Sequence, residues 1–207
     1  MGAVVALSGM LDARQVWRGR AMPVPAGEQP TGWLALDAAL PAGGWPDAAL
    51  TEILLPADGV GELSLLLPTL ARLSQGKRPV LVVAPPYLPC VAGWQQHGVD
   101  MRRVEMVAAP EADVLWATEQ CLRSGSCSAV LAWPRQADDR ALRRLQVAAD
   151  AGKALGFAFR DRKHLPAASP AALRLEIEAA PRSRVWVRKC RGGAVPSQPF
   201  PFPRSLH

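Results

Sequence analysis

The stretch TEILLPADGVGELS, residues 51–64, decides how the rest of this chain is organised. It joins a short apolar run to a loop with two glycines, and an apolar-periodic segment then continues through Leu70. This pattern is typical of a buried strand that leads through a phosphate-type loop into a helix. The sequence therefore predicts the architecture of a nucleotide-binding α/β protein at this point.

The loop lacks the residues that nucleotide chemistry requires. A working loop reads G-x-x-x-x-G-K-[ST], in which backbone N–H groups hold phosphates, the lysine reaches the outer phosphates and the hydroxyl binds magnesium. Counted back from Gly61, the other three key positions hold Pro56, Glu62 and Leu63. A carboxylate at the lysine position repels a triphosphate. We therefore interpret the stretch as a nucleotide-binding architecture that has lost its nucleotide chemistry.

Two interpretations of Gly59 and Gly61 stay open. They could expose backbone N–H groups at a helix N-terminus and form an anion site. Alternatively, they only make the turn, because Glu62 adds negative charge at the same end.

Composition limits the classes of protein that fit. The chain has 207 residues, 49% of them hydrophobic, and a net charge of +6, which suits either a nucleic-acid partner or a basic surface without one. The four cysteines lie apart and do not suggest a metal site or a disulfide framework. Apolar runs are shorter than the roughly 20 residues of a membrane span. We expect a cytoplasmic protein.

Strands and helices alternate strictly from residue 51 to residue 159. The sequence predicts strands at 51–55, 79–84, 104–107, 129–133 and 156–159, and helices at 63–73, 88–97, 111–123 and 138–153. Pro68 should kink the first of these helices. The fold class is therefore α/β, a doubly wound and mainly parallel sheet with helices on both faces.

The ends of the chain have a different character. Residues 173–179 and 184–190 alternate apolar and polar side chains, which predicts an antiparallel hairpin at the sheet edge. Residues 1–30, with one short helix at 11–18, form a partly flexible arm. The core domain is then 31–193, and 194–207 is a Pro/Phe-rich tail.

Several motifs together resemble the RecA recombinase core. They are TG-x-L-x-LD-x-AL-x-x-GG from Thr31 to Gly44, GVD at 98–100 and L-x-SG at 122–125. The resemblance places the family's catalytic glutamate on Pro86, its metal-side acidic residue on Trp133 and its loop lysine on Glu62. It therefore implies a RecA-like core without ATPase activity, cofactor or metal.

With its GVGEL loop at residues 59–63, the chain is similar to the ImuA family. That resemblance implies a non-catalytic subunit of the SOS-induced mutasome, which promotes error-prone translesion DNA synthesis and associates with the nucleoid during DNA damage. The implied partners are an ImuB-like inactive Y-family polymerase relative, an error-prone C-family DNA polymerase, RecA and, weakly, DNA. A SulA-like cell-division inhibitor that binds FtsZ ranks second. A residual nucleotide-binding protein or weak ATPase ranks third.

Candidate binding residues follow from charge and aromatic placement. Basic residues suited to phosphate contact are Arg160, Arg162, Lys163, Arg184, Arg188, Lys189 and Arg191. A solvated loop explains the first three equally well. Candidates for partner contact are Trp186, Phe200 and Phe202, each of which could instead pack against the sheet. Trp133 could likewise fill the core or form a partner surface.

Overall fold

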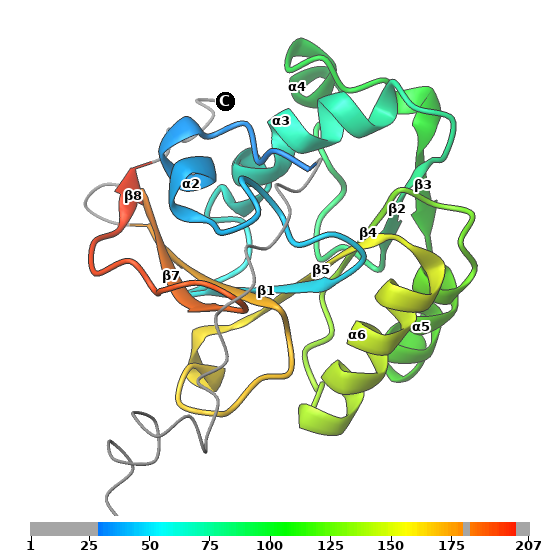
Figure 1. Ribbon diagram of the computed structural model, residues 1–207. Helices are drawn as coiled ribbons and strands as arrows, with labels where there is room; N and C mark the ends of the chain where they lie inside the picture. Colours follow the sequence, from blue (N-terminus) through cyan, green and yellow to red (C-terminus); the bar gives the residue numbers. More distant parts are fainter. Residues whose placement is uncertain (1–28, 180–182, 202–207) are drawn as a thin grey trace, which may run out of the picture.

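The computed structural model describes residues 29–179 and 183–201 (Figure 1). The helix predicted at 11–18, residues 180–182 of the hairpin turn and Phe202 lie outside these residues. The helices are α2 (Leu34–Ala39), α3 (Glu62–Ser74), α4 (Val91–Gln96), α5 (Val114–Arg123) and α6 (Asp139–Gly152), with 3-10 turns η1 (Met101–Arg103), η2 (Glu111–Asp113) and η3 (Arg162–His164). The strands are β1 (Leu50–Leu55), β2 (Val80–Val83), β3 (Val104–Val107), β4 (Ala129–Ala132), β5 (Leu155–Asp161), β6 (Leu173–Glu178), β7 (Arg184–Cys190) and β8 (Phe200–Pro201).

The strands form one sheet in the order β3-β2-β4-β5-β1-β6-β7-β8. All pairs from β3 to β6 are parallel, whereas β7 and β8 join antiparallel. Strand β1 lies inside the sheet, with Ile53 opposite Phe159 of β5 and Leu175 of β6. The predicted mostly parallel α/β sheet with a C-terminal antiparallel hairpin is confirmed.

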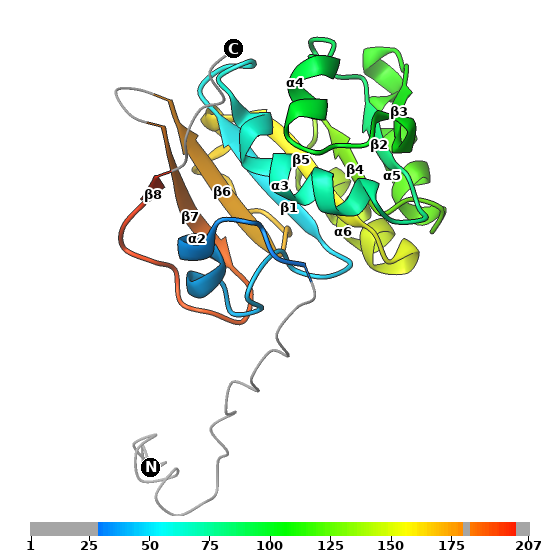
Figure 2. The ribbon, with the colours of Figure 1, turned by 90° about the horizontal axis from the view of Figure 1, so that it is seen from above.

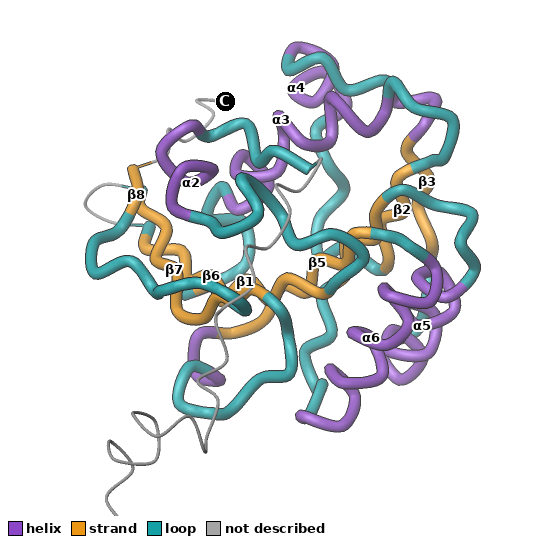
Figure 3. The backbone as a smooth tube through the Cα atoms, in the orientation of Figure 1, coloured by secondary structure: helices purple, strands orange, loops and turns teal. Residues whose placement is uncertain are grey.

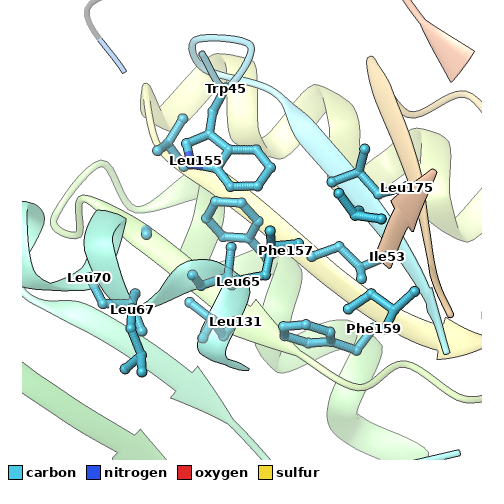
Figure 4. Packing of buried hydrophobic residues seen from close by; sticks show 14 of the residues in the cluster. Trp45, Ile53, Leu65, Leu67, Leu70, Leu131, Leu155, Phe157, Phe159 and Leu175 are labelled. Carbon is cyan, nitrogen blue, oxygen red and sulfur yellow. The ribbon is translucent and has the colours of Figure 1, made fainter. Parts of the chain in front are cut away.

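Helices cover both faces of this sheet. Helices α2, α3 and α4 lie on one face and α5 and α6 on the other (Figures 1 and 3). Each face has its own apolar cluster, because side chains of the buried strands alternate between the two. On the α3 face, Trp45 meets Phe157 edge-on with ring centroids 5.1 Å apart (Figure 4). The fully buried strands therefore carry the near-continuous apolar runs seen in the sequence.

Residues 31–45, which precede β1 and are called the entry segment here, are hydrogen-bonded to α3. The Trp45 indole N–H donates to Thr69 Oγ1 over 2.7 Å, and that hydroxyl donates to the Thr31 carbonyl over 3.2 Å. Gly32 has φ +87°, and a Cβ there would lie 2.3 Å from Cβ of Pro68. The glycine of the entry motif is therefore required by close contact with the proline inside α3, which is assigned as one helix through Pro68. Figure 2 shows α2 and α3 over the same face of the sheet, with α2 above the hairpin strands and α3 above β1 and β5.

Several elements differ from their predicted bounds by one to three residues, and α4 and β5 show two of the causes. Helix α4 begins at Val91 rather than 88, because Pro89 disfavours helical backbone at Leu88 and Cys90 Sγ caps the helix by accepting from the Gly93 N–H. Strand β5 continues two residues past the predicted end, to Asp161. This extension buries Arg160, because its side chain finds an acidic partner inside the fold.

That partner is Glu52, whose carboxylate lies between two buried arginines. Arg160 Nη1 lies 2.6 Å from Glu52 Oε1, and Arg174 Nε lies 2.8 Å from Glu52 Oε2. Glu52 is 0% exposed and the two arginines are 5% and 6% exposed. Arg160 also donates to the Ala137 carbonyl, and Arg174 donates to carbonyls of the segment that follows β5. The triad thus joins β5, β1 and β6.

We expect Glu52→Gln to lower the free energy of unfolding by about 3 kcal/mol or more, because it leaves two buried guanidinium groups without a counter-charge. Urea unfolding followed by circular dichroism measures this. Arg143→Ala is the matched control: it removes an exposed helix pair with Asp139 and should cost about 0.5 kcal/mol or less. Equal effects of the two substitutions would contradict the structural role of the triad.

Candidate functional site

The loop between β1 and α3 has the backbone that its glycines predict. Gly59 has φ +76° and Gly61 has φ +89°, values that are costly for residues with a Cβ. Gly61 is the N-cap of α3, and no side chain caps the helix from that position. The loop therefore turns sharply and brings backbone N–H groups to the N-terminus of α3, as in a phosphate-binding loop.

Glu62 occupies this region with its own carboxylate. The residue is 4% exposed, and its Oε1 accepts the Gly59 N–H over 3.2 Å. A carboxylate at a helix N-terminus interacts favourably with the helix dipole. The chain thus supplies an internal anion to a loop that in nucleotide-binding proteins receives a phosphate, which favours the interpretation of the glycines as turn residues.

Two side chains from the segments that follow β4 and β2 contact the same loop. Arg135, after β4, makes an ion pair of 2.6 Å with Asp58 in the loop. Tyr87, after β2, places its ring against Gly59, where an added Cβ would lie 3.5 Å from a ring carbon. Three contacts within the chain therefore hold the loop: those from Glu62, Arg135 and Tyr87.

The positions that the RecA resemblance assigns to acidic residues carry no charge. Trp133 directly follows β4, is 5% exposed and stacks on Phe159 with ring centroids 4.6 Å apart. Pro86 follows β2 in a half-buried bend. Of the two interpretations of Trp133, core filling is the one that this packing favours. That the chain is not an enzyme stays a prediction.

The structure removes Arg160 from the DNA-binding candidates. Its guanidinium is buried and paired with Glu52, so a phosphate could reach it only if the sheet opened. Arg162 and Lys163 of the same run are exposed and lie 3.8 Å from Glu176 and Asp161 respectively. These two side chains remain accessible to an anionic partner.

Most cations of the hairpin already have partners within it. Arg184 pairs with Glu178 at 2.9 Å, and Arg188 pairs with Glu176 at 2.6 Å. Trp186 donates its indole N–H to Glu178 over 3.1 Å, and the Arg188 guanidinium lies 4.6 Å from the centre of its ring. Phosphate contact at Arg184 or Arg188 would therefore have to displace an ion pair, and the Trp186 ring is not a free stacking surface.

The remaining candidates lie at the end of β7 and at the sheet edge. Lys189 donates to the Ser169 carbonyl, and burial lowers the pKa of its ammonium group. Arg191 donates to the Pro170 carbonyl over 3.2 Å and is exposed. Phe200 pairs with Val185 on the sheet edge and packs against the core cluster. Of the two interpretations of Phe200, packing is therefore the one that the structure favours.

Sequence reasoning missed the acidic partners of these cations. Arg174, Glu176 and Glu178 alternate along β6. Glu178 lies directly opposite Arg184 of β7, whereas Glu176 lies opposite Trp186 and pairs diagonally with Arg188. The alternation of charge in LRLEIE and RVWVR was a signal that could have found these cross-strand pairs. The closing contacts of Tyr87, Asp58 and Arg135 had no such signal, because they depend on how three separate loops meet.

Comparison with known protein families assigns the chain to a family. Residues 49–156, from the approach to β1 to the start of β5, match the model of the family described as Cell division inhibitor SulA. The chain belongs to the SulA family. The sequence interpretation had ranked SulA second, behind ImuA. Membership of the ImuA family stays a prediction.

Two SulA proteins illustrate the relationship. A cell division inhibitor SulA from Edwardsiella piscicida is 37% identical over 113 residues, which is 52% of this chain and 66% of that protein. The crystal structure of SulA from Pseudomonas aeruginosa matches with 27% identity and a TM-score of 0.46, covering 56% of this chain and 98% of that one. The chain thus spans slightly less than two thirds of the Edwardsiella SulA. Among the described residues, no helix is long and apolar enough to cross a membrane.

We expect no binding of ATP at millimolar concentration, because Glu62, Arg135 and Tyr87 occupy or close the loop and no lysine stands at its head. Equilibrium dialysis with labelled ATP measures this. A catalytically competent RecA protein serves as the positive control. Saturable ATP binding would instead restore the hypothesis of a residual nucleotide-binding protein.

Proposed function

We propose that this member of the SulA family inhibits cell division by binding a protein, the bacterial tubulin FtsZ, and that it is not an enzyme. The family match over residues 49–156 carries this proposal. The name printed for the Edwardsiella relative, a cell division inhibitor, points in the same direction. Production of the protein after DNA damage would fit this role.

The arrangement of the loop supports action by contact. Its anion-binding N–H group is paired with Glu62, and its rim is closed by the Arg135–Asp58 ion pair. A protein that acts through its surface needs a rigid scaffold but no nucleotide. The matched region, which holds α3, α4, α5 and α6, is then the part that carries the inhibitory surface.

We expect the purified chain to reduce FtsZ polymerisation at roughly equimolar concentration, because an inhibitor that acts by binding must be present in amounts comparable with its target. Light scattering and sedimentation of FtsZ with GTP measure this, and overproduction should give filamentous cells.

The hairpin provides a control for this experiment. The double substitution Arg184→Ala and Arg188→Ala changes β7, which lies outside the family match, and should leave the inhibition unchanged. Unaltered FtsZ assembly in the presence of excess folded protein would rule out this target.

A second candidate is an accessory subunit of an error-prone translesion complex, with the ImuB-like protein, the C-family polymerase, RecA and DNA as contacts. The observation that favours it is the structure outside residues 49–156. The entry segment is bonded to α3 through Thr31, Trp45 and Thr69, and the hairpin continues the same sheet. These parts are integral to the fold and lie beyond the SulA family match.

Affinity purification from DNA-damaged cells, followed by mass spectrometry, separates the two candidates. The cell-division proposal predicts recovery of FtsZ, because the inhibitor should bind it directly. The same hairpin substitutions should not reduce that recovery. Recovery of a Y-family polymerase relative that is lost in the hairpin variant would instead favour the translesion complex.

A further inference from the structure

Basic side chains gather at one edge of the sheet, where four neighbouring parallel strands begin. Val80 of β2 lies opposite Val104 of β3 and Ala129 of β4, and Ala129 in turn lies opposite Leu155 of β5. The segments that precede these strands, residues 75–79, 98–103, 124–128 and 153–154, therefore lie side by side. They contain one acidic residue, Asp100, and five basic residues, which together form the basic edge: Lys77, Arg78, Arg102, Arg103 and Lys153. The whole chain has 24 basic and 18 acidic residues, so positive charge is concentrated here.

Most of this charge has no acidic partner. Two of the five basic side chains form exposed ion pairs with carboxylates two or three residues away in the sequence. The other three, Lys77, Arg78 and Arg103, are exposed and make no ion pair with any residue that the structure describes. In contrast to the arginines of the hairpin, these three side chains can meet an external anion without first breaking an ion pair.

Hydrogen bonds orient the basic edge without neutralising it. Arg103 Nη1 donates to the Lys77 carbonyl over 3.3 Å. Arg78 donates to the carbonyls of Gly125 and Lys153 over 3.5 and 3.2 Å. A carbonyl oxygen carries no net charge, and each guanidinium keeps further N–H groups for an anion. Helices α3, α5 and α6 end beside these segments, but each helix end contributes only about half a negative charge, so the three unpaired cations outweigh them.

The shape and composition of the basic edge favour the phosphate backbone of duplex DNA as its partner. Neighbouring strands lie about 4.8 Å apart, so the edge extends about 14 Å from β3 to β5 and spans about four phosphates of one DNA strand. Its segments contain no aromatic residue for stacking on the bases of single strands. They also contain none of the large apolar side chains that are exposed elsewhere in the described residues, whereas the centre of a protein interface is apolar.

We propose that the basic edge binds duplex DNA through its phosphates, without reading the base sequence. Lys77, Arg78 and Arg103 make the contacts, and the other two basic side chains flank them. None of the basic residues predicted from the sequence to contact DNA belongs to this edge. Arg162 and Lys163 follow the carboxyl end of β5 and so lie at the opposite edge of the sheet. This inference goes beyond the proposed function, since it holds whether or not the chain binds FtsZ.

The test uses the full chain and a fluorescein-labelled duplex of about 20 base pairs, with fluorescence anisotropy measured from about 50 to 200 mM salt. We expect saturable binding that is equal for two unrelated sequences, and log K should fall with log salt concentration with a slope of about −3, one unit for each unpaired cation. The double substitution Lys77→Ala and Arg103→Ala should weaken binding about tenfold or more at the lowest salt and change the slope to about −1. Lys77→Ala alone, whose side chain makes no hydrogen bond with the described residues, should change the slope by about one.

The double substitution Arg162→Ala and Lys163→Ala is the matched control, because it also removes two exposed cations but at the opposite edge of the sheet. It should leave the slope unchanged. The proposal is overturned if the duplex does not bind at 50 mM salt, if the slope is the same with and without Lys77 and Arg103, or if the control weakens binding equally. Poly-glutamate that competes as well as unlabelled duplex of equal charge would overturn it in favour of an acidic protein partner.

Discussion

The carboxylate of Glu52 is the interaction on which the sheet depends. It lies in β1, the strand that separates the nucleotide-type half of the sheet from the hairpin half, and it holds Arg160 of β5 and Arg174 of β6. One carboxylate offsets only one of the two buried positive charges. The rest of the stabilisation comes from main-chain carbonyls that accept from both guanidinium groups. These bonds fix the segment after β5 and set the position from which the hairpin starts.

The candidate binding surfaces also differ between the two sides of β1. On one side of β1, the loop before α3 is closed by contacts within the chain, and a pocket lies beyond it at the ends of β2, β3 and β4. On the other side, β6 and β7 carry arginines and glutamates that neutralise one another. Groups that would bind nucleotide or phosphate in a RecA-like protein are thus engaged inside this one. Arg162, Lys163 and Arg191 stay accessible, and so does the apolar surface around Leu88 and Met106.

Much of the fold was predictable because its strands are apolar at nearly every position. The run PVLVVA gave β2, and alternation in LRLEIE and RVWVR gave the hairpin. Strand β8 was not predicted, because a two-residue strand whose second residue is a proline has no periodicity. Arg160 was misplaced because RDRKH resembles a solvated basic run. The corrective clue was Glu52: a carboxylate within an apolar strand needs a buried cation, although the sequence does not say which one.

The buried triad of Glu52, Arg160 and Arg174 shows that the unit that folds together extends beyond the region matched by the family model. The match ends at residue 156, whereas Arg160 and Arg174 lie beyond it. In this chain, an excised fragment 49–156 would keep the Glu52 charge but lose both cations, and β1 would lose β6 as its neighbour. The carboxylate would then stand on an open strand edge of the kind that invites pairing with other chains. The segments after residue 156 therefore cover an edge of β1 that the excised fragment would expose.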